Sequence, residues 1–235
     1  MKTITLVAAV LAPLALGACA TLFGSASPFA FDKKGELVEF NYAWSAEASR
    51  QPALVRQLRR DLEAAFKSTT SAATADRAST RAGERPFKGH LYTRRWTTAG
   101  QSPRLLSLDG RLSASTGGDP SRRADGLLWD RSARSEIRLD QLFASAGAVD
   151  QMVRGPGCVL LARRLPAAGA APCPGAGAFI PADDNDNRRF DHFRLVAPIA
   201  RGGDPFTVVN VPVTAALLAT LKPAYRPGFE VAQPQ

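Results

Sequence analysis

The stretch VEFNYAWSAEASRQPALVRQLRRDLEAAF, residues 38–66, decides how the fold begins. Its first part alternates, so that Val38, Phe40, Tyr42 and Trp44 share one face of an extended strand. After Pro52, which suits a first helical turn, apolar residues recur at helical spacing. They are Leu54, Val55, Leu58, Leu62 and Phe66, opposite Arg56, Arg59, Arg60 and Glu63. This pattern predicts a strand followed by an amphipathic helix.

Beyond this helix the patterns predict two groups of strands. Residues 68–84 are rich in alanine, serine and threonine, and fit either a continued helix or a mobile connection. Strand patterns follow at residues 91–97, 104–113, 126–130, 193–199 and 206–213, and helical patterns at 137–164, broken near residues 155–157, and 214–221. Short turns at residues 100–103 and 202–204 join neighbouring strands. We therefore expect an α+β fold of antiparallel sheets with amphipathic helices on one face, rather than a parallel βαβ fold.

The N-terminal segment predicts export. Lys2 precedes an apolar run, residues 4–16, which is too short to span a membrane and ends in small residues. Residues 16–19, Leu-Gly-Ala-Cys, have the form of a lipobox, which predicts a signal peptide over residues 1–18 and a lipid anchor on Cys19. Ordinary secretion, with Cys19 removed, is the alternative. Ala20 after the cysteine favours the outer membrane, facing the periplasm, and residues 19–36 are expected to be a tether.

Removing Cys19 leaves one pair of cysteines, Cys158 and Cys173. In an oxidising compartment we expect them to form a disulfide, although two buried thiols are the alternative. The chain lacks CxxC spacing and contains only 2 histidines, so we expect no zinc or iron–sulfur site and no cofactor.

The composition is that of a globular protein with a basic surface. The chain has 235 residues, 45% of them hydrophobic, and a formal net charge of +9. Arginine pairs recur at positions 59–60, 94–95, 122–123, 163–164 and 188–189. Export excludes nucleic acid as the partner, so these pairs either face solvent or meet anionic envelope material.

The order of several short segments resembles one bacterial extracytoplasmic domain family, shared by the RsiV ectodomain and the N-terminal region of the deacetylase PdaC. These segments include residues 40–42, 105–108, 116–118, 128–130, 139–143, 173–174, 211–213 and 222–226. The resemblance implies one domain over residues 37–230, with two halves meeting near residue 115. It further implies binding of peptidoglycan fragments or of a wall-active protein such as lysozyme. The chain lacks the His of the family's Gly-Gly-Ala-His-Pro turn, so no role of that histidine is carried over.

No motif of a known catalytic class is present. The sequence has no GxSxG, SxxK, HExxH or Walker motif. Asp191 beside His192 suggests an acid–base pair, but neighbours in a strand point to opposite faces, which disfavours it. The sequence therefore predicts that the protein is not an enzyme.

Acidic residues are the candidate binding residues. Residues 183–187, Asp-Asp-Asn-Asp-Asn, copy the start of a calcium loop, but Arg188 replaces the required glycine and Arg194 the bidentate glutamate. An Asx-rich turn is the better interpretation, with an irregular calcium site as the alternative. A basic partner such as lysozyme needs local carboxylates, so we expect Asp119, Asp183, Asp184 and Asp186 to form the binding surface. The second functional hypothesis is a structural or assembly partner of another cell-envelope protein.

Overall fold

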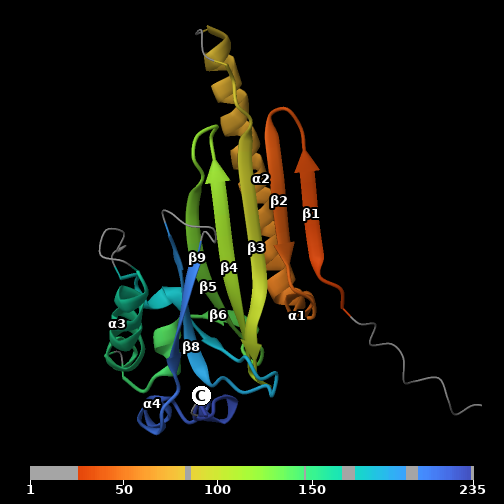
Figure 1. The fold of residues 1–235 in the computed structure, drawn as a ribbon. Helices are drawn as coiled ribbons and strands as arrows, with labels where there is room; N and C mark the ends of the chain where they lie inside the picture. The colour runs from red at the N-terminus through yellow and green to blue at the C-terminus, as the bar shows by residue number, and fades with distance from the viewer. Residues whose placement is uncertain (1–25, 83–85, 146, 166–172, 200–205, 234–235) are drawn as a thin grey trace, which may run out of the picture.

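A computed structural model describes residues 26–82, 86–145, 147–165, 173–199 and 206–233. Two sheets form the molecule, one of six strands in the order β1-β2-β3-β4-β5-β6 and one of three in the order β7-β8-β9 (Figure 1). Every neighbouring pair but one is antiparallel, and the helices pack outside the sheets, so the α+β class is confirmed. Cys19 and the predicted signal peptide lie outside the described residues.

The exception is a parallel pair near the N-terminus. After strand β2 (Val38–Trp44) the chain forms two helices, α1 (Ala46–Ser49) and α2 (Pro52–Ala82). It then enters strand β3 (His90–Gln101), which lies parallel to β2. The prediction of antiparallel pairing alone is wrong here, because the long helix carries the chain back to the end at which β2 began. Helix α2 is 31 residues long. Of the two interpretations of residues 68–84, a continued helix or a mobile connection, the helix is therefore correct as far as Ala82.

Helix α2 covers one face of the larger sheet. The predicted apolar face of β2 lies under it, with Phe40, Tyr42 and Trp44 at most 3% exposed. Leu54 and Leu58 of the helix are fully buried against them. No helix within the described residues is long and apolar enough to cross a bilayer.

The tether predicted over residues 19–36 is too long. Residues 29–34 form strand β1 (Phe29–Lys34), which pairs with β2 at the edge of the sheet. Phe29 stacks on Trp44 with ring centroids 3.8 Å apart, and Phe31 meets Phe66 of α2. Aromatic packing therefore draws this segment into the fold.

The expected boundary between two halves near residue 115 is also wrong. Strands β4 (Leu105–Ser115) and β5 (Ser121–Asp130) form a hairpin within the larger sheet, and β6 (Ser135–Ile137) continues it. The alternating apolar residues of β4 face opposite sides, with Leu106 and Leu108 toward α2 and Leu105 in the second core. The two cores are therefore divided by the sheet and not by a point in the chain.

The second core includes most of the C-terminal half. Its elements are η1 (Leu139–Leu142), the π-helical turn η2 (Asp150–Arg154), α3 (Gly155–Arg164), η4 (Ala176–Ala178), β7 (Phe179–Ala182), β8 (His192–Pro198), β9 (Phe206–Pro212), α4 (Ala215–Thr220) and η5 (Arg226–Gly228). The predicted hairpin of β8 and β9 is confirmed, while its turn lies outside the described residues. The break expected near residue 155 is a change of helix type rather than an interruption, because the π-helical turn η2 ends at Arg154 and α3 begins at Gly155.

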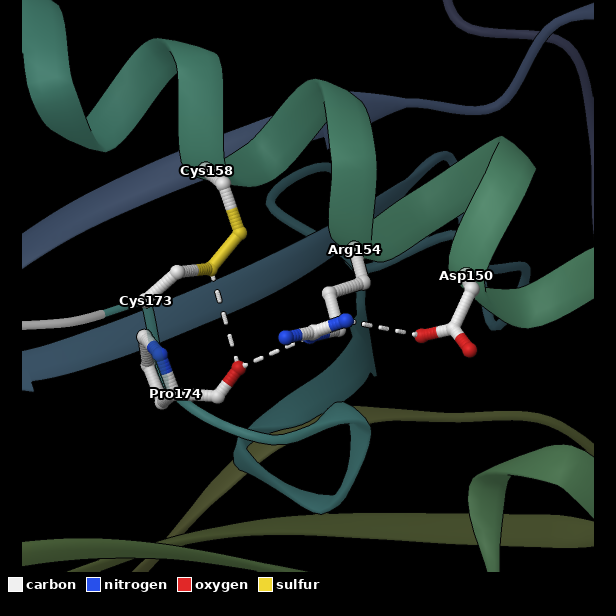
Figure 2. The surroundings of a disulfide bond; sticks show 5 residues. All are labelled: Asp150, Arg154, Cys158, Cys173 and Pro174. Carbon is white, nitrogen blue, oxygen red and sulfur yellow. Dashed lines mark hydrogen bonds and ion pairs between the residues drawn. A yellow bond between two sulfur atoms is a disulfide. The ribbon is translucent and has the colours of Figure 1, made fainter.

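The predicted disulfide is present and joins α3 to the segment before β7. Cys158 and Cys173 have Cα atoms 5.5 Å apart, within the usual range for such bridges. Figure 2 shows Arg154, one turn earlier on the helix side, donating from Nε to the carbonyl of Pro174 at 3.2 Å. Asp150 lies 3.4 Å from the same guanidinium. Helix and segment are therefore held together both covalently, through the disulfide, and by the hydrogen bond from Arg154.

The smaller sheet packs on the face of the larger sheet opposite α2, over its lower half in Figure 1. One close approach is at Gly126 of β5, where a Cβ atom would overlap Cγ2 of Ile180 and lie 3.1 Å from the carbonyl of Gly177. The two sheets can approach this closely only because residue 126 has no side chain.

We expect Gly126→Ala to lower the free energy of unfolding by about 1 to 3 kcal/mol, because the added methyl group forces the sheets apart. Gly118→Ala is the matched control, since a Cβ atom there meets nothing within 4 Å. Urea unfolding followed by circular dichroism measures both variants. Equal stability of the two would contradict the close packing at residue 126.

Candidate binding groove

A groove of about 970 Å³ runs along strand β9. Helix α3 forms one wall with Leu160, Arg163 and Arg164, and the loop before β8 forms the other with Asp184 and Asn185. Residues 231–233 of the C-terminal segment also line it. The groove therefore brings together residues from four separate parts of the C-terminal half.

His192 lies at the base of the loop wall, 6% exposed. Its Nδ1 is 2.5 Å from Asp191 Oδ1, and its Nε2 is 3.5 Å from Asp184 Oδ2. The expectation that Asp191 and His192 point apart is wrong, because β8 begins at His192 and Asp191 lies before the strand. The rule of alternating faces does not apply across that boundary.

Arg194 extends this cluster toward the interface between the sheets. Its guanidinium pairs with Asp184 and lies 3.4 Å from His192 Nε2. Burial is the largest influence on the pKa of the Asp109 carboxyl on β4 and raises it. Arg111, which donates a hydrogen bond to Asp109, and the charge of Arg194 both act in the opposite direction but do not outweigh burial. Asp109 Oδ1 and Arg194 Nε are buried without a partner among the described residues.

The two arginines of α3 differ in their contacts. Arg164 donates from Nη1 to the carbonyl of Val208 on β9 at 2.8 Å. Arg163 is exposed and has no ion pair or hydrogen bond within the described part of the chain. Its guanidinium is therefore available to a ligand in the groove.

Only part of the predicted acidic surface lies at this groove. Asp184 lines it, whereas Asp183 accepts hydrogen bonds from the backbone N–H groups of Asn185 and Arg188 and so shapes the loop. Asp186 occupies the left-handed region of that loop, with φ of 55°.

Asp119 lies far from these residues. It belongs to the β4–β5 turn, beside the start of β3, while Asp183 bonds to Ala99 near the end of that strand. Eight residues of strand separate the two ends, about 26 Å. The four carboxylates therefore do not form one surface.

The structure favours the Asx-turn interpretation of residues 183–187. Among the described residues, no group of three or more His, Cys, Asp or Glu side chains is placed to hold a metal ion. The carboxylates of Asp183 and Asp184 are instead engaged by backbone N–H groups and by Arg194.

The arginine pairs noted in the sequence are spread over different surfaces. Arg94 is buried and donates to Asp125 at 2.6 Å, while Arg59 and Arg60 are exposed on α2. Only Arg163 and Arg164 border the groove. Val208, Asn210 and Thr214, which also line it, carry no sequence pattern that sets them apart from ordinary strand and cap residues.

The fold is similar to that of two solved proteins of the DUF3298 family. One is from Bacteroides fragilis, with 10% sequence identity, coverage of 83% of this chain and 91% of that chain, and a TM-score of 0.51. The other is from Pseudomonas aeruginosa, with 13% identity, coverage of 83% and 94%, and a TM-score of 0.50. No family model and no curated protein matches the sequence. At these identities the likeness establishes the fold class alone.

Proposed function

We propose that the protein is an exported envelope lipoprotein whose domain binds peptidoglycan fragments in the β9 groove without catalysing a reaction. The lipobox at Cys19 supports the location at the outer membrane, facing the periplasm. The resemblance to the RsiV ectodomain and to the N-terminal region of PdaC supports a ligand connected with the cell wall. A wall-active protein such as lysozyme is the other ligand in the same proposal.

The free cation of the groove carries the choice of ligand. On one wall the guanidinium of Arg163 has no partner among the described residues, whereas on the other wall Asp184 pairs with Arg194 and Asp191 lies against His192. Peptidoglycan stem peptides carry carboxylates, which the guanidinium of Arg163 can bind. Lysozyme is strongly basic, and Arg163, Arg164 and the net charge of +9 oppose its approach. Peptidoglycan fragments are therefore the favoured ligand.

The lining supports binding rather than catalysis. Thr214 supplies the hydroxyl group among the described lining residues, and its oxygen accepts from the N–H of Leu217 as the N-cap of α4. Both ring nitrogens of His192 have close polar neighbours, Asp191 on one side and Asp184 and Arg194 on the other. No nucleophile lies beside a free base in this arrangement.

We expect Arg163→Glu to weaken binding of purified muropeptides about tenfold. The substitution replaces the free cation of the groove with a carboxylate, which repels the carboxylates of the stem peptide. Isothermal titration calorimetry on the chain lacking the signal peptide measures this. Arg60→Glu is the control, since Arg60 is exposed on α2 and lies outside the groove.

Lysozyme, with an unrelated basic protein as control, is titrated at low and physiological salt in the same way. Specific binding of lysozyme without binding of muropeptides would show that the ligand is a wall-active protein and not a peptidoglycan fragment. Binding of neither would overturn the proposal.

A further inference from the structure

Strand β9 is an open edge of the three-stranded sheet. In an antiparallel pair, alternate residues direct their N–H and C=O groups to the partner strand. The N–H of Val213 donates to the carbonyl of Asp191 at 2.8 Å, and Val211 and Val209 lie opposite Phe193 and Leu195 in the same register. Val208, Asn210 and Pro212 therefore direct their backbone polar groups away from β8.

These outward groups are largely unused. The carbonyl of Val208 accepts from Arg164, which confirms that it faces outward. The N–H of Val208 and both the N–H and C=O of Asn210 have no hydrogen-bond partner among the described residues. Asn210 is also exposed. A row of backbone donors and acceptors thus faces the groove.

The opposite edge of this sheet is closed, in contrast. All of β7 is buried, and Asp183, just after it, donates from its N–H to the carbonyl of Ala99 on β3. Natural proteins usually protect an open edge with charged residues, bulges or a covering segment. Among the described residues, Arg164 is the side chain that bonds to this edge, at the carbonyl of Val208, and helix α3 lies beside it as the wall of the groove.

The charge along the edge indicates the kind of segment that fits. Asp184 is already neutralised by Arg194 and lies beside His192. Arg163 has no counter-charge among the described residues, and Arg164 uses only a backbone carbonyl. The uncompensated charge beside β9 is therefore positive and favours acidic side chains.

We propose that β9 recognises an extended, acidic segment of a partner protein, which adds to the sheet as a fourth strand. The segment's N–H groups take the carbonyls of Val208 and Asn210, and its carbonyls take the N–H groups of the same residues. Arg164 moves from Val208 to an acidic side chain of the segment, beside Arg163. This inference rests on the β9 groove being the binding site proposed above, and it adds a second ligand class there, a partner protein that is recognised by main-chain pairing.

The test separates main-chain pairing from side-chain contact. The probe is a fluorescein-labelled hexapeptide of alternating valine and glutamate, and a valine–lysine hexapeptide is the charge control. Asn210→Pro removes the outward N–H without removing a bond to β8, and proline is tolerated at sheet edges. Asn210→Ala is the matched control, because it removes the side chain and keeps the N–H. Fluorescence anisotropy is measured on the full mature chain in detergent.

We expect Asn210→Ala to leave the affinity within about twofold and Asn210→Pro to weaken it at least about tenfold. The lysine peptide is expected to bind at least about tenfold more weakly than the glutamate peptide. Amide hydrogen exchange of the unmutated chain gives a second readout, in which Val208 and Asn210 become protected when the glutamate peptide is bound. This readout decides the matter if the proline variant does not fold.

Equal affinities of the proline and alanine variants, with no added protection at Val208 and Asn210, would overturn strand addition. Absence of binding of the glutamate peptide would do the same. Muropeptide binding distinguishes this result from failure of the proposed function. If muropeptides bind and the peptide does not, strand addition alone fails, and if neither binds, both proposals fail.

Discussion

Replacing Asp130 with alanine is expected to lower the free energy of unfolding by about 3 to 4 kcal/mol, a large part of the stability of an ordinary domain. Asp130 is 1% exposed at the end of β5. The substitution leaves Arg104 without its partner and leaves two backbone N–H groups of the following turn without an acceptor. Losses of this size are typical when one member of a buried, charged hydrogen-bond network is removed.

The carboxylate of Asp130 joins three parts of the chain. Its Oδ1 accepts from the N–H groups of Ser132 and Ala133 at 2.9 and 3.1 Å, which shapes the turn into β6. Its Oδ2 accepts from Arg104 Nε at 2.9 Å, just before β4, and from the hydroxyl of Tyr225 at 3.3 Å. Arg104 in turn lies over the ring of Tyr225, 4.4 Å from its centroid. The segment after α4 is thereby attached to the larger sheet.

The pH dependence of stability gives a second readout of the same group. Burial alone would raise the pKa of Asp130, but hydrogen bonds from Ser132, Arg104 and Ala133 outweigh it and lower the pKa from 3.8 to about 2. A carboxyl whose pKa is lowered by folding stabilises the protein above its unfolded pKa, and loses that contribution as pH falls through its folded pKa. The contribution is about 2.5 kcal/mol at neutral pH. In Asp130→Asn we expect it to be absent.

Urea unfolding of the unmutated chain and of Asp130→Asn at a series of pH values measures this contribution. The difference between them should be constant from neutral pH to about pH 5 and should shrink between about pH 4 and pH 2. Asp140→Ala is the control, because its pair with Arg138 is exposed and such surface pairs contribute little to stability. Two results would show that the network does not stabilise the fold. One is a difference in the free energy of unfolding between the unmutated chain and Asp130→Asn that does not change with pH, and the other is an equal loss of stability in Asp140→Ala.

The Asp130 network also joins two segments that are distant in the sequence, residues 128–130 and 222–226. In the structure Leu128 packs in the second core, and the hydroxyl of Tyr225 lies 3.3 Å from Asp130 Oδ2. Loss of the carboxylate therefore removes a direct contact between these two segments.

Local patterns predicted the elements of the fold better than their pairing. The alternation of residues 38–44 and the helical spacing after Pro52 led directly to β2 and α2, because both elements bury one face. Strand β1 was missed, since its two partly buried aromatic rings, Phe29 and Phe31, depend on partners distant in sequence. The parallel pairing of β2 and β3 depends on the full length of α2, and the residues after Phe66 carry no strong pattern.

The groove was less predictable than the fold. Asp184 was selected for its charge, but the partners that define its position, Arg194 and His192, depend on where β8 begins. Arg163 and Asn210 matter because they have no partner among the described residues, and a sequence does not show which groups remain unpaired. Sequence alone therefore located one wall of the site and not its edge strand.

Removing the disulfide by Cys158→Ala together with Cys173→Ala is expected to lower the free energy of unfolding by about 3 kcal/mol. The bridge closes a loop with a sequence separation of 15, and the loss of that closure gives the unfolded chain more conformations. Arg154 still holds the carbonyl of Pro174, so the loop is expected to keep its position on α3 and the variant to keep its fold.

Thermal unfolding with and without a reducing agent measures the effect of the bridge. The reductant should lower the melting temperature of the unmutated chain to that of the double variant and should leave the double variant unchanged. Adding Arg154→Ala to both backgrounds forms a double-mutant cycle. A larger effect of Arg154→Ala without the bridge would show that the hydrogen bond and the disulfide secure the same segment. If the double variant and the oxidised unmutated chain have the same melting temperature, the bridge does not stabilise the fold. In that case burial of the flanking residues alone holds α3 against β7.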